Sequence, residues 1–318
     1  MNPTLQTLLL VPSLLIGLLT LAGLLAWAER RLLARCQNRI GPNRCGPCGI
    51  LFFVADGIKL MSKEDWIPPA ADKPVFVLAP AIILVTALIS FTVIPLTPGI
   101  GILDLNIGIL FFLALSSMGI YSTVLGGWSS NNKYSLLGGL RMSAQMFSYE
   151  VFMGLSLMGV VILSGSLNLR EIVAAQSELW FVVPQFPGFL IFLIAGLAES
   201  HRLPLDMPEA ESELVAGYHT EYSSMKFGLF FIGEYVGITL FSAITVTLFF
   251  GGWQGPLLPP IVWFMLKTMA FIAFFILLRA AIPRPRFDQL LGWGWKILLP
   301  LALLNLLATG AIALACDN

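Results

Sequence analysis

The chain has 318 residues, of which 57% are hydrophobic and only 11% are charged, and its formal net charge is zero. A soluble domain carries roughly 25% charged residues, so this composition excludes a soluble globular protein and indicates a polytopic membrane protein in a lipid bilayer. Zero net charge gives no attraction to nucleic acid, which we do not expect as a partner. The apolar N-terminus has no basic region before it and no evident cleavage site, so we expect a retained span rather than a signal peptide.

Eight stretches are apolar enough to cross a membrane, which takes about 20 mostly apolar residues each. We therefore predict an all-α polytopic membrane protein, with eight transmembrane helices in a single domain covering 1–318. The predicted spans are 3–28, 74–96, 105–128, 141–163, 180–198, 225–250, 259–278 and 295–315. No internal repeat is apparent, which argues against the common inverted-repeat transporters.

Lysine and arginine are distributed unevenly between alternate loops. Sixteen of the 18 lie in or at the edge of the loops 29–73, 129–140, 199–224 and 279–294. The opposite loops hold only Arg170, and Lys267 lies inside a span. Because cytoplasmic loops carry an excess of positive charge, these four loops are predicted to be cytoplasmic and both termini periplasmic.

The first cytoplasmic loop holds more than a plain connection. Between Gly49 and Lys63, a set of mostly apolar side chains recurs at helical spacing, and most charged side chains lie outside this set. The members of the set are Leu51, Val54, Ala55, Ile58, Met61 and Ser62. This pattern predicts an amphipathic helix at the membrane interface. The basic turn before it, Arg35–Arg44, reflects topology and tight-turn chemistry, or it forms a docking face or a gate.

Acidic residues and histidines gather between the fifth and sixth predicted spans. The 24 residues from Glu199 to Tyr222 hold a third of the 18 acids and both histidines; they are Glu199, Asp206, Glu209, Glu211, Glu213, Glu221, His201 and His219. Clustered carboxylates beside a bilayer are costly unless they face water, a partner or a proton path. A helix starting at Pro208 explains only the two acids of its first turn. Adjacent acids raise one another's pKa, which suits a proton relay.

Three ionisable residues lie inside predicted spans: Glu150, Glu234 and Lys267. Such groups are expensive in a bilayer and usually face a bundle interior or a water-filled path. They hold spans together as buried ion pairs, or the two glutamates continue the acidic loop inward as a proton path. Cys45 and Cys48 look like half of a metal knuckle, but no second pair follows, so we expect no metal site. Disulfides are not expected in a cytoplasmic loop.

Several stretches occur together and in the same order in one known family. They are Glu29-Arg30-Arg31, Arg39-Ile-Gly-Pro-Asn-Arg44, Ala55-Asp56-Gly-Ile-Lys59-Leu60, Lys63-Glu64-Asp65, Trp128-Ser-Ser-Asn-Asn-Lys133, Arg202-Leu-Pro-Leu-Asp206, Glu209 to Tyr222 and Gly251-Gly-Trp-Gln-Gly-Pro256. Over essentially its whole length the chain resembles one family of membrane-arm subunits of NADH–quinone oxidoreductase, respiratory complex I. That family includes the bacterial H-type subunits and their mitochondrial counterpart. The chain departs from the family's frequent residues at Cys45, Cys48 and Leu205.

The resemblance implies a bacterial inner-membrane subunit that meets the peripheral arm and helps to form the chamber for a quinone. Ubiquinone is the expected quinone, with menaquinone the alternative. The chamber and its mouth would be lined by Glu29, Arg30, Arg39, Asp56 and Lys59, with Arg284, Arg286 and Lys296 on its flank. Proton coupling would use Asp206, Glu209, Glu211, Glu213 and Glu221, continued into the membrane by Glu150 and Glu234. The chain would hold no redox centre, since flavin mononucleotide and the iron–sulfur clusters would belong to partner subunits.

Three other functions stay open at this stage. One is a membrane subunit of a related hydrogenase or ferredoxin-linked complex, although the acidic run and the loop from Arg39 to Arg44 favour the quinone enzyme. A second is a stand-alone cation/proton antiporter, which fits the intramembrane Glu and Lys residues but not the missing repeat. The third is a purely structural anchor.

Overall fold

A computed structural model describes residues 3–202, 204–206 and 214–316, so the predicted coupling residues Glu209, Glu211 and Glu213 lie outside the described part. Regular structure in these ranges is helical, apart from one isolated β-bridge between Thr97 and Ile100. The helices are α1 Pro3–Cys36, α2 Phe52–Ser62, α3 Lys73–Ser90, α4 Gly108–Ser129, α5 Lys133–Ser164, α6 Leu169–Ala175, α7 Phe186–Glu199, α9 Ser224–Phe249, α10 Pro260–Ala281, α11 Phe287–Trp293 and α12 Leu299–Cys316. Short 3₁₀ turns cover Pro47–Gly49, Phe91–Val93 and Gly217–His219.

Seven helical segments of the described chain are long and apolar enough to cross a membrane. They correspond to seven of the predicted spans, and they confirm an all-helical polytopic membrane protein. The remaining predicted span, 180–198, overlaps α7, which has 14 residues and ends at Glu199. At 1.5 Å per residue it is about 21 Å long, less than the ~30 Å hydrocarbon core. The eight-span arrangement therefore stays a proposal.

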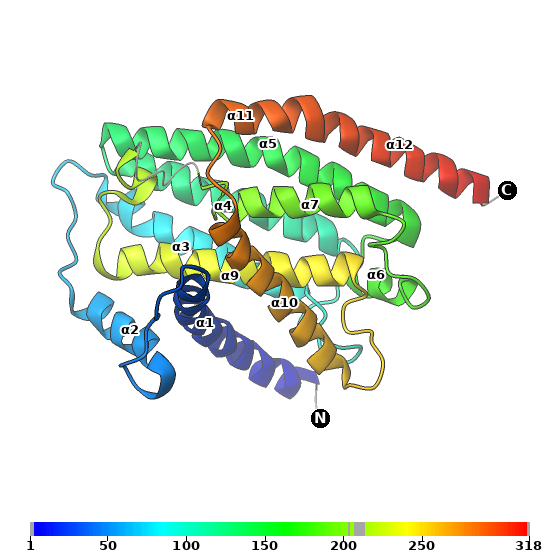
Figure 1. Ribbon diagram of the computed structural model, residues 1–318, viewed down its shortest axis with the longest axis horizontal. Coiled ribbons are helices and arrows are strands. Elements are labelled where there is room, and N and C mark those ends of the chain that lie inside the picture. Colours follow the sequence, from blue (N-terminus) through cyan, green and yellow to red (C-terminus); the bar gives the residue numbers. More distant parts are fainter. Residues whose placement is uncertain (1–2, 203, 207–213, 317–318) are drawn as a thin grey trace.

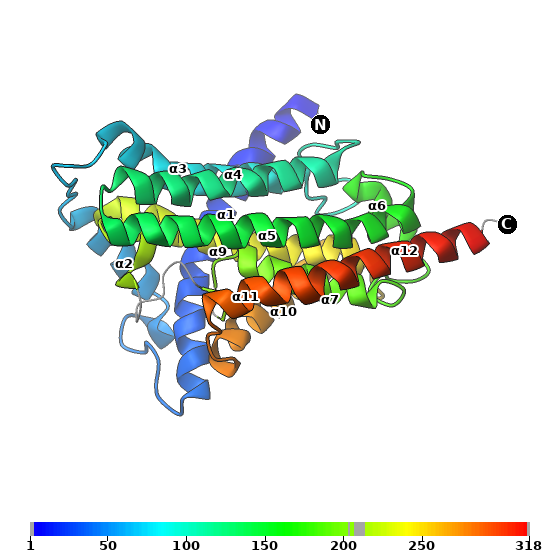
Figure 2. The ribbon, with the colours of Figure 1, turned by 90° about the horizontal axis from the view of Figure 1, so that it is seen from above.

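Helices α3, α4, α5, α7 and α9 run side by side, while α1 and α10 cross this bundle at a steep angle (Figures 1 and 2). Helix α9 lies at the centre and is buried on nearly all sides, because it packs against α1, α3, α7 and α10. Small residues let α4 and α5 approach closely: a Cβ on Gly127 would lie 2.5 Å from the carbonyl oxygen of Ser135. Close backbone approach of this kind is what packs helices in a membrane.

The connections α2–α3 and α4–α5, and the one that leads into α9, lie at one end of the bundle, on the left of Figure 1, and the C-terminus lies at the opposite end. This agrees with alternate loops lying on opposite faces of a membrane. Which face is cytoplasmic follows from the charge distribution alone and stays a prediction.

Helix α1 is longer than the predicted first span. It continues to Cys36, so Glu29 and Arg30 lie on a helix rather than in a loop. The turn after it folds back onto α1: Arg31 Nη1 and Trp27 Nε1 donate to the carbonyl of Cys48 at 2.7 and 3.2 Å. Gly49, at φ +77°, fits against Pro42 where a Cβ would lie 2.2 Å from the Pro42 oxygen. This turn positions the start of α2.

The amphipathic helix expected in this loop is present as α2. The predicted apolar face points outward, with Val54, Ile58 and Met61 all exposed. The opposite face packs inward, where Phe53 contacts Gly23 of α1 and Leu60 contacts Gly228 of α9. An outward apolar face is what a helix on a membrane surface presents, and its location there remains a prediction.

Helix α5 is capped by the Asn132 side chain, which accepts from Tyr134 N, and ends at Gly165 with φ +69°. The last predicted span begins earlier than expected, because α11 and α12 are joined by a π-helical turn at Gly294–Leu298. A Cβ on Gly294 would lie 2.6 Å from the Phe152 ring of α5. The glycine therefore lets this turn lie directly on α5.

Candidate functional site

Four charged side chains and a tyrosine meet at the centre of the bundle, and we call them the central charge cluster. They come from α1, the segment after α7, α9 and α10; they are Glu29, Arg202, Glu234, Tyr235 and Arg279. All but Arg279 are buried, and the Arg279 side chain is 37% exposed. Two carboxylates face two guanidinium groups, so the cluster is electrically balanced and opens outward at Arg279.

Glu29 is the hub of the cluster. Its carboxylate accepts from Arg202 Nη1 at 3.0 and 3.3 Å, from Tyr235 Oη at 2.9 Å, and from Arg279 Nη1. Charge-assisted bonds of this kind are roughly twice as strong as neutral ones. Both carboxylate oxygens are thereby engaged by donors, which offsets the cost of removing them from water.

Arg202 joins Glu29 to Glu234. Its guanidinium lies 4.2 Å from the centroid of the Tyr235 ring, and Nη2 lies 3.6 Å from Glu234 Oε2. Burial opposes the charge on Arg202, but the facing carboxylates Glu29 and Glu234 outweigh it and raise its pKa. The contact with Glu29 is close and that with Glu234 is looser, so Arg202 is held asymmetrically between them.

Local backbone geometry directs these side chains inward. The α7 helix ends at Glu199, and His201 then adopts φ +56°, which turns the chain sharply. Gln145 of α5 fixes this turn, since its Nε2 donates to the carbonyls of Ala198 at 3.0 Å and Leu205 at 2.8 Å. A buried amide that spans the turn holds Arg202 in register with α1 and α9.

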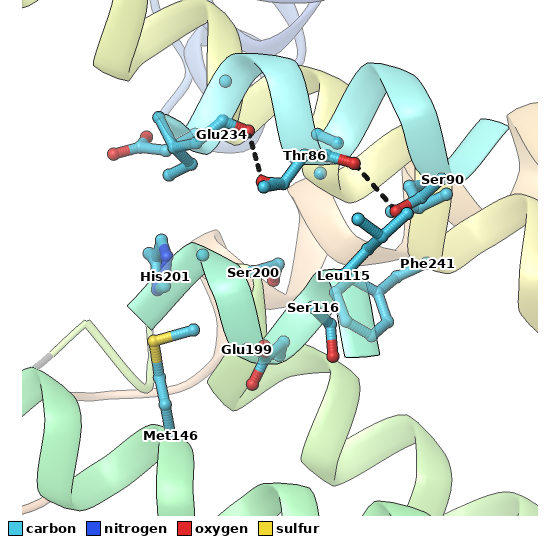
Figure 3. Close-up of a pocket in the computed structure, with 16 residues that line it drawn as sticks. Thr86, Ser90, Leu115, Ser116, Met146, Glu199, Ser200, His201, Glu234 and Phe241 are labelled. Carbon is cyan, nitrogen blue, oxygen red and sulfur yellow. Dashed lines mark hydrogen bonds between the residues drawn. The ribbon is translucent and has the colours of Figure 1, made fainter. Parts of the chain in front are cut away.

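A cavity of about 50 Å³ adjoins the cluster on the side of α3 and α4. Figure 3 shows Glu234 on one wall and Glu199, Ser200 and His201 on the opposite wall. Hydroxyl groups of α3 and α4 also line it: Thr86, Ser90 and Ser116. One water needs roughly 10–15 Å³ of such space and two to four polar partners, so the cavity has room for a few waters.

A second pair of carboxylates, Glu199 and Glu150, begins at the wall of this cavity. Glu199 is buried at the end of α7 and is close enough to Glu150 of α5 for their charges to repel. Ser117 of α4 hydrogen-bonds Glu150. One oxygen of each carboxylate, Glu199 Oε2 and Glu150 Oε1, has no hydrogen-bond partner among the described residues. Two neighbouring carboxylates that each bury an unsatisfied oxygen are suited to sharing a proton.

The structure brings together some of the residues predicted for the quinone chamber and for proton coupling. Arg30 lies 3.5 Å from Asp56, and Arg284 lies 3.2 Å from Asp206. Glu221 accepts from Asn132 Nδ2 at 2.6 Å, away from the central charge cluster. The remaining predicted chamber residues are exposed; they are Arg39, Lys59, Arg286 and Lys296. Of the predicted set, Glu29 and Glu234 belong to the central charge cluster itself.

From the sequence, Glu199 and His201 were placed in the acidic stretch without a role of their own, and no role was assigned to Arg202, Tyr235 or Arg279, which the structure also places at this site. The sequence could have indicated Arg202, because it is a lone arginine within an acidic stretch. It could also have indicated Arg279, which is a cation at the end of an apolar run. No pattern in the sequence points to Tyr235, which the fold alone brings to Glu29.

His201 provides a pH-dependent prediction. Burial, and then the charge of Arg202, lower its pKa to about 3. Neutral His201 therefore contributes stability that is fully present above about pH 6.5, the value when unfolded, and is lost as the pH falls towards 3. Asparagine cannot titrate and tolerates the φ of +56°. The stability advantage of the wild type over His201→Asn should shrink by about 1.4 kcal/mol between pH 7.5 and 5.5.

Thermal unfolding of the purified complex at the two pH values measures this difference. His219→Asn removes the other histidine, which is only partly buried, and serves as the matched control. An unchanged difference between His201→Asn and wild type across the range would contradict the assignment of a buried neutral imidazole.

Long apolar helices around a buried, charge-balanced cluster define a multi-pass membrane protein with an ionisable core. Residues 9–310 match the model of the NADH dehydrogenase family. The chain is also 62% identical over 309 residues to the H subunit of NADH-quinone oxidoreductase from Methylococcus capsulatus (strain Bath), covering 96% of this chain and 98% of that relative. The chain therefore belongs to the NADH dehydrogenase family, and within it to the H subunits of NADH–quinone oxidoreductase.

Proposed function

We propose that the chain is a core membrane-arm subunit of a proton-pumping NADH–quinone oxidoreductase in a bacterial inner membrane. In this proposal it crosses the membrane eight times, with both termini periplasmic and α2 on the cytoplasmic surface. It assembles with other membrane-arm and peripheral-arm subunits, and the flavin mononucleotide and iron–sulfur clusters lie on those partners. The 62% identity to a subunit of this enzyme favours it over a hydrogenase-linked complex or a lone antiporter.

The central charge cluster, adjoining a cavity that Glu234, Glu199 and His201 help to line, is the observation that carries the proposal. Quinone reduction takes two electrons and two protons, so it creates a local demand for protons. A chamber lined by Glu29, Arg30 and Asp56 would place the head group near the cluster's open end at Arg279. Of the predicted chamber residues, Glu29 alone reaches from that end to the buried Arg202.

Arg202 can link proton uptake at the quinone to the protonation of Glu234 further inside the bundle. A negative charge that develops beside Glu29 attracts the guanidinium of Arg202 and draws its Nη2 further from Glu234. This contact is already loose, at 3.6 Å. Glu234 then loses the cation that favours its ionised form and takes up a proton from the cavity. Glu199 and Glu150 continue the route through α7 and α5, and Asp206 and Glu221, with Glu209, Glu211 and Glu213, supply it from the cytoplasmic side.

Glu213→Gln tests the contribution of the acidic loop. If the loop couples quinone chemistry to proton movement, the assembled variant should lose NADH-driven quinone reduction and proton pumping together. Both are measured in proteoliposomes after purification through a tag on this chain, with piericidin or rotenone to define the quinone-specific rate. Glu64→Gln, an exposed acid outside the loop, is the control. Full activity and pumping in assembled Glu213→Gln would contradict the proposal.

A further inference from the structure

Lys267, the one lysine within the described span helices that lies deep in the bundle, has no place in the route above. It lies in the third turn of α10 and is buried. Its ammonium donates to three backbone carbonyls, those of Phe250 at 2.6 Å, Gln254 at 2.7 Å and Gly252 at 3.2 Å. It also lies 4.4 Å from the centroid of the Trp180 ring. Three acceptors and an aromatic face together form a complete cation site.

The carbonyls belong to the connection between α9 and α10. Phe250 is the C-terminal cap of α9, where the helix dipole favours a positive charge. Gly251 and Gly252 have φ of +66° and +50°, values that glycine adopts without cost, and the turn they form directs the alternate carbonyls of Phe250, Gly252 and Gln254 towards the ammonium. A neutral amine has only two hydrogens to donate, so the three acceptors match the charged form.

The other end of α10 carries Arg279, which contacts Glu29. The two residues Lys267 and Arg279 are 12 positions apart, or about 18 Å along the helix axis. Between them α10 buries Thr268, Ile272, Phe275 and Ile276, and the Phe271 ring packs edge-on against Phe250. The polar contacts of Lys267 and Arg279 add a fixed point at each end of this packed face.

We propose that Lys267 is the outer anchor of α10 and a positioning residue for the central charge cluster. By tying α10 to the end of α9, it fixes the height at which Arg279 meets Glu29. Its effect on quinone reduction rests on the function proposed above, whereas its effect on the helix does not. Lys267 therefore acts through Arg279 and carries no proton of its own.

A double-mutant cycle with Arg279→Gln tests this. In the otherwise wild-type complex, Lys267→Met should raise the KM for quinone about tenfold with a smaller change in kcat, because Arg279 is misplaced. In the Arg279→Gln background the same change should have no further effect on KM. Lys267→Arg, which keeps the charge, should retain most of the wild-type KM. Lys133→Met, which removes a lysine at the start of α5, is the control for lost charge.

A loss of equal size in both backgrounds would overturn the proposal, because Lys267 would then not act through Arg279. Should Lys267→Met fail to assemble, Trp180→Leu removes only the aromatic face and should shift KM in the same direction by less. Hydrogen exchange of the complex without NADH or quinone measures how firmly Lys267 holds α10, independently of quinone chemistry. Lys267→Met or Trp180→Leu should speed exchange at 250–259 and at 279–282, and unchanged exchange at both segments would also overturn the anchor.

Discussion

Glu29→Gln is expected to cost the assembled protein about 3 kcal/mol of stability and to remove most quinone reduction. The amide keeps the shape of the carboxylate but not its charge, so Arg202 and Arg279 are left facing Glu234 alone. Breaking a buried ion pair on one side is strongly destabilising because the other charge stays buried and unpaired. Thermal unfolding and NADH-driven quinone reduction of the purified complex measure the two effects.

A second substitution separates charge balance from shape. Glu29→Gln combined with Arg279→Gln restores equal numbers of positive and negative groups, leaving Arg202 with Glu234. The double variant should regain at least half of the stability that Glu29→Gln loses, since residues in one network are not additive. Glu64→Gln, an exposed acid outside the cluster, is the control for removal of one carboxylate. Simple addition of the two losses would show that the cluster is not one balanced unit.

Glu234→Gln is expected to abolish proton pumping and to lower quinone reduction about tenfold, equivalent to about 1.4 kcal/mol of barrier. Glutamine occupies the same wall of the cavity but cannot take up or release a proton. In a coupled enzyme the redox step slows when its proton cannot move. Pumping is read from acidification of proteoliposomes, and quinone reduction from NADH oxidation in the same samples.

Two further variants make this prediction selective. Glu234→Asp keeps a titratable group one methylene shorter and should retain part of the pumping. Thr86→Val replaces a cavity hydroxyl by a methyl group of similar size, so it should weaken pumping less than Glu234→Gln does. Normal pumping in assembled Glu234→Gln would show that protons do not pass through this cavity.

Much of the helical framework could be predicted from the sequence because apolar length is a local property. Seven runs that met the length requirement correspond to long helices, with ends that shift where capping and packing intervene. Helix α1 passes its predicted end and reaches Cys36, since Glu29 finds a buried partner in Arg202 and Arg30 pairs with Asp56 at the surface, so neither charge has to leave the helix. The 14 residues of α7 follow a turn at 181–185 that composition did not separate from the span.

The residues of the candidate site were predicted unevenly, for a physical reason. A carboxylate inside an apolar run stands out by its cost, so Glu150 and Glu234 were identified. An arginine beside a membrane is ordinary under the positive-inside rule, so Arg202 and Arg279 looked like topology signals. Their function depends on which carboxylate they meet, and that partner is far away in the chain. Lys267 likewise stood out, because burying a charge in a membrane is costly. Its partners could not be predicted, because they are backbone carbonyls, which every residue has.

By itself the sequence determined that the protein is a polytopic helical membrane protein of this family, and that acids gather between two of its spans. These properties follow from composition, apolar length and short motifs, which need no contact between distant residues. Only the tertiary structure decided that Glu29, Arg202, Glu234 and Arg279 form one balanced cluster next to a small cavity. Burial makes isolated charges too costly, so the fold must pair them, and the pairing depends on how four separate segments cross.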